Sequence, residues 1–316
     1  MAHESELKGK RVMVTGAAGF LGAHMVKRLL SEGAAVDAVV KAAVEPNSPI
    51  HGLGAKVTLH QVDLTDRAAL SRLVGATVPE LIIHCAALTH VGQSFDRVDE
   101  NIRTNIGGTV NLLHALDGRY QRFVYVGSSD VYGDVPTPFR EDGPVSPVSP
   151  YAVSKYAAER FCRMYHQAYG WPIVCLRPFN AFGPFQTIDR IIPSLILSAL
   201  AGKDLDMTEG RQTREFMYVD DLVEAFVRAL WTPGIEGEVI NVSGGQEVSI
   251  RELAVTVLTL LGNPVQPLFG ALDYRPNEIW RMYGDTTKVR ALLGWTPTTS
   301  LVDGLSATIE WCRTHH

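Results

Sequence analysis

The sequence of 316 residues lacks the features of several large classes of protein. No apolar run reaches the roughly 18–20 residues needed to span a bilayer. The N-terminus reads Met-Ala-His-Glu-Ser-Glu and has no apolar segment of the kind found in signal peptides. The net charge of −5 provides no excess of basic residues for binding nucleic acid. We therefore expect neither a membrane nor a nucleic acid as a partner.

Cysteine is scarce and is not arranged to bind a metal. The four cysteines, Cys85, Cys162, Cys175 and Cys312, lack metal-type spacing, and two of them lie in apolar strand-like runs. We interpret them as reduced core residues of a cytoplasmic protein and predict no metal site. The remaining composition, with 46% hydrophobic and 20% charged residues, is typical of a globular protein of one or two domains.

Short apolar runs alternate with helical runs through the first 180 residues. The runs predicted as strands are 11–15, 35–40, 57–62, 81–85, 123–126 and 173–176. This alternation predicts a Rossmann-type α/β fold, a doubly wound parallel sheet with helices on both faces. The alternation ends near residue 181. We expect residues 1–180, joined by a later segment near 215–245, to bind a dinucleotide, and residues 181–316 to form mainly a smaller α/β substrate lobe.

A glycine turn follows the first predicted strand and precedes a helical run. Gly16, Gly19 and Gly22 stand three residues apart. Such glycines let backbone N–H groups approach a pyrophosphate, and the helix N-terminus adds partial positive charge. The pattern predicts a site for NAD or NADP, although a glycine-rich turn without a ligand is the alternative. The other residues of this candidate cofactor site are Ala18, Phe20 and Leu21.

The ends of the next strands suggest how the cofactor lies. The second strand ends at Val40 and Lys41, where NAD-binding proteins usually carry an acid for the ribose 2′-hydroxyl. A lysine there favours NADP, although Lys41 equally suits a solvated loop. The third strand ends at Asp63-Leu64, placed to meet an adenine edge. The small residues Ala86-Ala87 after the fourth strand leave room for a cofactor to pass.

Two histidines lie near the fourth strand and invite a catalytic interpretation. His84 falls within the apolar run and His90 follows it. A histidine inside a buried strand is more often a hydrogen-bonded core residue than a catalytic one, so we interpret His84 in that way.

Tyr151 and Lys155 are the candidate catalytic pair. They open a run without glycine or proline that extends to Tyr169 and predicts a helix. Residues four apart share one helix face, with Cβ atoms about 5–6 Å apart. We expect the lysine cation to lower the phenol pKa from its usual value near ~10, so that the phenol exchanges protons near neutral pH. The alternative is a chance spacing within a long helix.

Other polar groups sit where a sheet of this kind opens onto its ligand. Gly127-Ser128-Ser129-Asp130 follows the fifth strand, and hydroxyls there are candidates for chemistry or for a local turn. Further along, residues 210–216 and 274–278 carry arginines in loop-like surroundings. These arginines suit a diphosphate clamp, or else a solvated surface.

Several of these motifs occur together in an order typical of one family. Gly16-x-x-Gly19-x-x-Gly22, Ser128, Tyr151-x-x-x-Lys155 and Arg177-Pro178-Phe179-Asn180 resemble the extended short-chain dehydrogenase/reductases, the nucleotide-sugar epimerase/dehydratase family. The likeness extends through the 275–285 segment to the tail Leu293-Gly294-Trp295.

The resemblance implies roles for individual residues. Tyr151 would be the acid/base, Lys155 its electrostatic partner and a ligand of the nicotinamide ribose, and Ser128 a ligand of the sugar oxygen. The remaining cofactor contacts would come from Asp63, Leu64, Ala86, Ala87 and Asn105. The substrate contacts would come from Ser129, Asn180, Arg214, Arg275 and Glu278. The helices that contain Asn101 and Tyr151 would form a homodimer interface.

The resemblance also implies an NAD(P)-dependent enzyme that transfers a hydride at C4 of a nucleotide-linked hexose. Asp130 stands where several dehydratases carry a glutamate but is one methylene shorter, so epimerase and dehydratase both remain open. Arg275-Pro276-x-Glu278 is also similar to reductases that act on GDP-4-keto-6-deoxymannose, and an NADPH-dependent 4-keto-reductase is an alternative. A sensor that binds NAD(P) without catalysis is a rival from another class. A dehydrogenase of a non-sugar alcohol would not need the two arginine segments.

Overall fold

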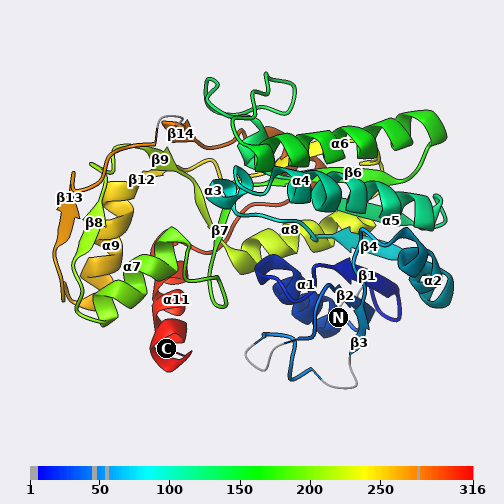
Figure 1. Ribbon diagram of the computed structural model, residues 1–316, viewed down its shortest axis with the longest axis horizontal. Coiled ribbons are helices and arrows are strands. Elements are labelled where there is room, and N and C mark those ends of the chain that lie inside the picture. Colours follow the sequence, from blue (N-terminus) through cyan, green and yellow to red (C-terminus); the bar gives the residue numbers. More distant parts are fainter. Residues whose placement is uncertain (1–5, 45–47, 54–56, 276–277, 316) are drawn as a thin grey trace.

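A large lobe built on one parallel sheet lies beside a smaller lobe of short strands and helices (Figure 1). The computed structural model describes residues 6–44, 48–53, 57–275 and 278–315. The large sheet has the order β11-β6-β5-β4-β1-β2-β3, and every neighbouring pair is parallel. The predicted Rossmann-type, doubly wound sheet is therefore confirmed.

Six strands of this sheet lie close to their predicted positions, and β11 joins them from later in the chain. They are β1 (Arg11–Thr15), β2 (Ala35–Val40), β3 (Val57–Gln61), β4 (Leu81–His84), β5 (Arg122–Val126), β6 (Ile173–Pro178) and β11 (Val239–Val242). Every residue of β5 is buried, and its side chains alternate between two cores. Phe123 and Tyr125 enter one core, and Val124 and Val126 enter the other, which explains why the strand is apolar throughout.

Helices cover both faces of the sheet. One face packs against α1 (Phe20–Ser31), α8 (Val219–Trp231) and α10 (Thr287–Leu293). The other face packs against α2 (Arg67–Thr77), α5 (Gly108–Leu116) and α6 (Pro150–Tyr169). Thus α8, α10 and β11 belong to the large lobe although they follow residue 180 in the chain.

Local signals set the ends of α6. The Ser149 hydroxyl accepts a hydrogen bond from the Ala152 N–H at 3.1 Å, and Pro150 occupies the first turn. Gly170 ends the helix with a φ of +69°. The buried face of the helix carries both Tyr151 and Lys155.

The helical segment from Val98 to Leu116 is divided into three elements. A short helix α4 (Val98–Asn101) passes into a π-helical turn, η2 (Ile102–Gly107), before α5 begins. The wider turn coincides with the buried side chain of Asn105, which bonds outside its own helix. Propensity alone gives no sign of this insertion.

The smaller lobe packs three helices against three short sheets. The helices are α7 (Ile191–Leu200), α9 (Ile250–Leu261) and α11 (Leu301–His315). The paired strands are β7 (Asn180–Phe182) with β10 (Phe216–Tyr218), and β8 (Leu205–Met207) with β13 (Pro267–Phe269). The third sheet places β9 (Thr213–Arg214) between β12 (Val248–Ser249) and β14 (Arg281–Met282). Among the described residues no helix is long and apolar enough to cross a membrane.

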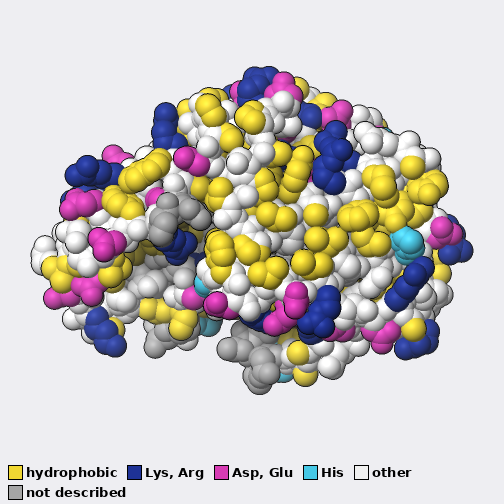
Figure 2. All heavy atoms as spheres, turned by 45° about the horizontal axis from the view of Figure 1, so that its top comes forward, with side chains coloured by type: hydrophobic (Ala, Val, Ile, Leu, Met, Phe, Trp, Pro, Cys, Tyr) yellow, Lys and Arg dark blue, Asp and Glu magenta, His cyan; other side chains and the backbone are white. Residues whose placement is uncertain are grey.

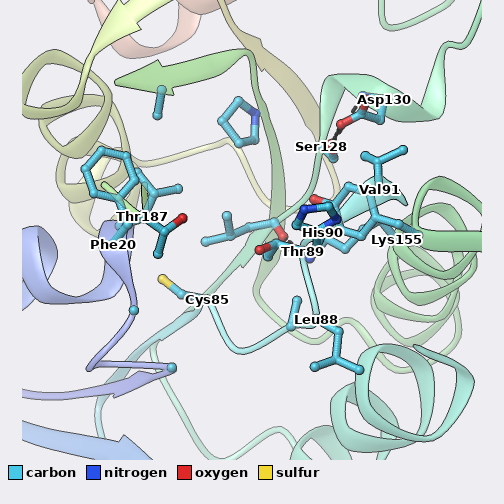
Figure 3. Close-up of a pocket in the computed structure, with 18 of the residues that line it drawn as sticks. Phe20, Cys85, Leu88, Thr89, His90, Val91, Ser128, Asp130, Lys155 and Thr187 are labelled. Atoms are coloured by element: carbon cyan, nitrogen blue, oxygen red, sulfur yellow. Dashed lines mark hydrogen bonds between the residues drawn. The ribbon is translucent and has the colours of Figure 1, made fainter. Parts of the chain in front are cut away.

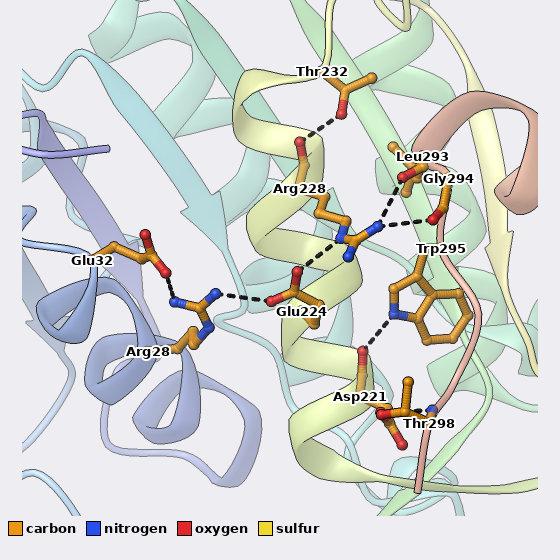
Figure 4. A network of polar contacts seen from close by, with 10 residues as sticks. All are labelled: Arg28, Glu32, Asp221, Glu224, Arg228, Thr232, Leu293, Gly294, Trp295 and Thr298. Carbon is orange, nitrogen blue, oxygen red and sulfur yellow. Dashed lines mark hydrogen bonds and ion pairs between the residues drawn. The ribbon is translucent and has the colours of Figure 1, made fainter. Parts of the chain in front are cut away.

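Polar contacts tie α8 both to α1 and to the C-terminal tail (Figure 4). Glu224 of α8 accepts from Arg28 of α1 at 3.0 Å and from Arg228 at 2.7 Å. The Trp295 indole donates to the Asp221 carbonyl at 3.0 Å. Because these bonds join three separate parts of the chain, they hold the tail against the large lobe.

The crowding at Gly22 can be tested by comparison with Gly75, which has open space around its Cα. A Cβ on Gly22 would lie 2.2 Å from the Gly16 carbonyl oxygen, whereas a Cβ on Gly75 in α2 would meet nothing within 4 Å. We expect Gly22→Ala to lower the free energy of unfolding by about 1–3 kcal/mol. Gly75→Ala should raise it by about 0.5–1 kcal/mol, because alanine is the better helix former. Urea unfolding measures both, and equal losses would contradict the proposed crowding.

Candidate active site

A cavity of about 1200 Å³ opens between the two lobes, above the carboxyl ends of the parallel strands (Figure 3). The labelled side chains Phe20, Thr89, His90 and Thr187 surround it. Every predicted site residue except Asn105 lines this cavity. These residues are Gly16, Ala18, Gly19, Phe20, Leu21, Gly22, Lys41, Asp63, Leu64, Ala86, Ala87, Ser128, Ser129, Asp130, Tyr151, Lys155, Asn180, Arg214, Arg275 and Glu278.

The glycine turn has the geometry needed to hold a pyrophosphate. Gly16 has a φ of +69°, and a Cβ there would lie 2.8 Å from the backbone of Ala86. Gly19 caps α1 without any side-chain hydrogen bond to the helix. The first N–H groups of α1 therefore remain available beside a turn whose largest side chains are methyl groups, and these residues fit a dinucleotide.

Lys41 and Asp63 form an ion pair at the end of the cavity where adenine is expected. The Lys41 ammonium lies 3.2 Å from the Asp63 carboxylate. The Thr65 N–H and hydroxyl each donate to Asp63 at 2.9 Å. Hydrogen bonds from Thr65, followed by the pair with Lys41, hold the pKa of Asp63 below its usual range. Lys41 is thus already paired, and its preference for a 2′-phosphate stays a prediction.

Asn105 lies behind the cavity rather than in it. Its amide donates to the Leu88 carbonyl at 3.1 Å and to the Ser154 hydroxyl at 2.8 Å, and its oxygen accepts from the Leu88 N–H at 2.8 Å. Asn105 therefore does not line the cavity, and the cofactor contact expected of it stays a prediction. Asn105 fixes the loop after β4 against α6.

Ser128 and Asp130 face each other at the end of β5. The Ser128 hydroxyl donates to the Asp130 carboxylate at 2.9 Å, as Figure 3 shows. Burial raises the pKa of the Asp130 carboxyl, while the Ser128 bond and the charges of Arg214 and Arg190 oppose the rise. A carboxyl in this environment accepts and releases protons closer to neutral pH than an exposed aspartate does.

The prediction that Lys155 lowers the pKa of Tyr151 is wrong. Burial raises the pKa of the phenol and Asp130 raises it further, while a hydrogen bond with Ser128 and the charge of Arg190 oppose the rise. Lys155 extends towards the sheet, where its ammonium donates to the Val126 carbonyl. The four-residue spacing brought both side chains to the buried face of α6, but it did not direct the ammonium towards the phenol.

Lys155 occupies an unusual position for a cation. It is 3% exposed, and its ammonium lies 4.5 Å from the centre of the Tyr125 ring. Burial lowers the pKa of Lys155 to about 8. The ammonium is therefore still mostly charged at neutral pH and still lines the cavity.

His84 is a core residue, as predicted. Its two ring nitrogens bond to the hydroxyls of Thr15 at 2.7 Å and Thr109 at 2.8 Å. Burial, together with the charge of Lys155, lowers the pKa of His84 to about 3, so the ring is neutral. Both nitrogens are occupied by neighbouring strand and helix side chains, and His84 takes no part in the cavity.

Two residues expected to bind substrate pair with each other in the smaller lobe. The Arg214 guanidinium donates to the Glu278 carboxylate at 2.5 Å and to the Ile279 carbonyl at 2.6 Å. The Asn180 amide donates to the Glu215 carbonyl at 3.0 Å. Arg214 is therefore neutralised within the protein, while Pro276 and Asn277, between Arg275 and Glu278, lie outside the described residues.

Among the cavity-lining residues that sequence reasoning did not assign to the site, four carry polar or charged side chains that the site can use: Thr89, His90, Asp189 and Arg190. Thr89 and His90 lie two and three residues after Ala87, so the rule that strand ends face the ligand could have found them. Asp189 and Arg190 stand directly before α7, and nothing in their local sequence marks them. Among the described residues no cluster of side chains suits a metal ion.

Comparisons with known proteins agree with this geometry. A model of the NAD-dependent epimerase/dehydratase family matches residues 12–243. The chain is 31% identical over 330 residues to the dTDP-glucose 4,6-dehydratase of Neisseria meningitidis, covering 96% of this chain and 93% of the relative. It is 35% identical over 313 residues to the UDP-glucose 4-epimerase of Mycolicibacterium smegmatis, covering 96% and 98%.

Solved structures with the same fold carry related ligands. A UDP-glucuronic acid 4-epimerase from Bacillus cereus, in complex with UDP-glucuronic acid and NAD, matches with a TM-score of 0.90 at 31% identity. That match covers 97% of this chain and 100% of the other. A UDP-glucose 4-epimerase from Thermotoga maritima with UDP-glucose matches with a TM-score of 0.90 at 26% identity, covering 96% and 99%.

The electrostatic link between Asp130 and Tyr151 can be measured directly. Because the Asp130 charge raises the pKa of Tyr151, Asp130→Asn should lower it, and Tyr151 should ionise at a lower pH. Ultraviolet titration of tyrosinate, taken as the difference from the matching Tyr151→Phe protein, measures this pKa. Asp189→Asn is the matched control, since Asp189 lines the same cavity but is not among the groups that shift Tyr151. An equal shift in both variants would contradict the specific link.

Proposed function

Because the chain belongs to the NAD-dependent epimerase/dehydratase family, we propose that it oxidises C4 of a nucleotide-linked hexose with NAD(P), with Tyr151 as acid/base. The observation that carries this proposal is the cavity itself. It joins the glycine turn, Tyr151, Ser128 and the arginines of the smaller lobe in one space. Its volume of about 1200 Å³ exceeds the roughly 300–1,000 Å³ of a site for one drug-sized ligand, so it suits two ligands.

The large lobe offers the residues that would hold the dinucleotide. Gly16, Gly19 and the start of α1 suit the pyrophosphate, Asp63 the adenine end, and Lys155 the nicotinamide ribose. When bound, oxidised NAD(P) supplies the acceptor for the hydride from C4 and a positive charge beside the phenol. The solved relative from Bacillus cereus holds NAD. NAD and NADP both remain candidates, because the Lys41 that favours NADP is paired with Asp63.

The smaller lobe offers the residues for a nucleotide sugar. Relatives of this chain are named for dTDP-glucose, UDP-glucose and UDP-glucuronic acid, which supports a sugar linked to a nucleoside diphosphate. Asn180 and Arg275 line the cavity from this side, together with the Arg214–Glu278 pair. Ser128 would hold the C4 oxygen next to Tyr151.

Tyr151 and Ser128 would move the proton at the C4 oxygen. As C4 is oxidised, its C–H bond breaks and its hydroxyl proton passes to the ionised phenol oxygen of Tyr151. The raised pKa of Tyr151 makes this oxygen a strong base once ionised, and the positive charge that oxidised NAD(P) would bring beside the phenol favours the ionised form. In the reverse direction the same raised pKa keeps the phenol protonated and ready to donate to a C4 carbonyl. The Ser128 hydroxyl lies beside both Asp130 and Tyr151.

Asp130 favours dehydration as the fate of the 4-keto sugar. Epimerisation needs only the 4-keto sugar to turn over so that C4 is reduced on its other face, whereas loss of water across C5 and C6 needs a further acid/base. Asp130 can take the C5 proton and return it to the departing C6 hydroxyl, so that water leaves and a C5–C6 double bond forms. Return of the C4 hydride to C6 and of a proton to C5 would then give the 4-keto-6-deoxy sugar with no net use of cofactor. The raised pKa of Asp130 and its position beside Tyr151 suit that proton exchange. The aspartate side chain is shorter than the glutamate of several dehydratases, so an epimerase is a second candidate. The similarity to two UDP-glucose 4-epimerases supports it.

An exposed apolar surface supports the proposal of a homodimer. Val98, Ile102, Val153, Phe161 and Met164 are exposed on α4, η2 and α6. Hydrophobic side chains gather over this part of the molecule in Figure 2. Such a patch is typical of a protein–protein interface. Sedimentation equilibrium that gives the mass of one chain at micromolar concentration would contradict a dimer.

Removing the phenol hydroxyl tests the assigned acid/base. Tyr151→Phe should lower kcat by about 10²- to 10⁴-fold, because the proton at the C4 oxygen loses its carrier. Binding of NAD(P), measured by fluorescence titration, should stay near the wild-type value. Tyr156→Phe is the matched control, since this tyrosine lies one turn further along α6 and does not line the cavity. Full activity of the Tyr151 variant would refute the assignment.

Product analysis separates the possible reactions. UDP-, GDP-, dTDP- and CDP-hexoses are incubated with the enzyme and followed by NMR, with and without NADPH. A dehydratase gives a 4-keto-6-deoxy sugar and an epimerase gives the C4 epimer, both without net use of cofactor, whereas a 4-keto-reductase consumes NADPH stoichiometrically. We expect the 4-keto-6-deoxy product, and we expect Asp130→Asn to reduce its formation more than the initial oxidation at C4. Binding of NAD(P) without turnover of any sugar would favour the sensor.

A further inference from the structure

The cations that line the cavity differ in how far the protein already neutralises them. Lys41 is paired with Asp63, and Arg214 is paired with Glu278. Arg190 lines the same cavity but forms no ion pair with a carboxylate among the described residues. Its charge is therefore available to a ligand.

Arg190 lies at the boundary between the lobes and is held there by neutral groups. Its guanidinium donates to the Thr89 carbonyl at 3.2 Å and to the Thr89 hydroxyl at 3.3 Å. Arg190 belongs to the smaller lobe, directly before α7, whereas Thr89 belongs to the loop after β4 in the large lobe. Both contacts are long and exposed to solvent, so they hold the side chain in place without cancelling its charge.

The carboxylate next to Arg190 in the chain, Asp189, interacts with several groups. The His90 ring accepts from the Gln93 N–H through Nδ1 at 3.1 Å, and its Nε2 lies 3.1 Å from the Asp189 carboxylate. A hydrogen bond with Thr187 and the charges of Arg190 and His90 lower the pKa of Asp189. Asp189 therefore balances part of the Arg190 charge without forming a direct ion pair with it among the described residues.

The charge of Arg190 acts on the reacting end of the cavity. It lowers the pKa of both Asp130 and Tyr151, and so it lies within electrostatic range of each. The start of α7 adds partial positive charge, because no side chain caps the helix and its first residues, Ile191 and Ile192, also line the cavity. An oxyanion near the hexose would meet both positive groups.

We infer that Arg190 is an oxyanion-binding residue of the substrate site, and that it exchanges Thr89 for an anionic group of the nucleotide sugar. This inference rests on the proposed function. Phosphate oxygens of the diphosphate and a carboxylate on the hexose share the required chemistry, a planar or tetrahedral oxyanion that a guanidinium binds with two parallel hydrogen bonds. The inference adds a cation to the diphosphate clamp assigned to Arg214 and Arg275.

Calorimetric binding tests the inference without requiring turnover. Arg190→Gln keeps an amide donor for Thr89 but removes the charge. UDP, dTDP and GDP are titrated into the NAD-loaded protein beside uridine, thymidine and guanosine. If Arg190 binds the diphosphate, Arg190→Gln should bind the nucleoside diphosphate preferred by the wild type about 10- to 100-fold more weakly, because a hydrogen bond to a charged group is lost. Its affinity for the matching nucleoside should change little. Arg211→Gln is the matched control, because Arg211 is an exposed arginine of the same lobe outside the cavity.

A second pair of ligands distinguishes the source of the oxyanion. If Arg190 binds a hexose carboxylate, Arg190→Gln should lose affinity for UDP-glucuronic acid by about tenfold or more relative to UDP-glucose. Its affinity for UDP should stay at the wild-type value. Arg190→Lys should recover part of either loss, since it restores the charge. If Arg190→Gln binds every ligand with the wild-type affinity, the inference about Arg190 is wrong while the proposed function stands. A wild-type protein that binds no nucleotide of the panel would overturn the proposed function as well.

Discussion

The buried ion pair between Glu159 and Arg177 is the interaction on which the site depends most. Arg177 of β6 donates to both carboxylate oxygens of Glu159 in α6, at 2.8 and 2.6 Å, and both side chains are almost fully buried. Losing one partner of such a pair leaves an uncompensated charge and costs about 3–5 kcal/mol. The pair fixes α6 on the sheet, and α6 carries Tyr151 about two turns and Lys155 about one turn before Glu159.

The cavity exists because the chain crosses repeatedly between two lobes. Strand ends of the large lobe supply the glycine turn, the loop after β4 and the Ser128–Asp130 turn, while α7 and the Arg214 region close the opposite side. The return of α8 and β11 to the large lobe, and the hydrogen bond that the Trp295 indole donates to the Asp221 carbonyl, hold the C-terminal tail against that lobe. The site is therefore a property of the interlobe arrangement rather than of one domain.

Some of the charged side chains in the cavity form ion pairs and others do not. The Lys41–Asp63 and Arg214–Glu278 pairs are neutral overall, whereas Lys155 lies against a carbonyl and Arg190 against a hydroxyl and a carbonyl. Burial raises the pKa of the Asp130 carboxyl and of the Tyr151 phenol, and the charge of Asp130 raises that of Tyr151 further. Positive charge without a direct carboxylate contact thus faces two groups that hold protons, an arrangement suited to proton exchange.

The sequence by itself determined the alternation of strands and helices, the glycine turn and the residues at strand ends, because periodicity and glycine spacing are local properties. Nearly all of the site residues selected from the sequence therefore line the cavity, including Ser128, Tyr151 and Lys155. Only the tertiary structure decided which charges are paired. It directed Lys155 to a backbone carbonyl, placed Asn105 behind the cavity and brought Arg190 to Thr89. Those outcomes depend on side-chain direction and on contacts between residues far apart in the chain, which local spacing does not specify.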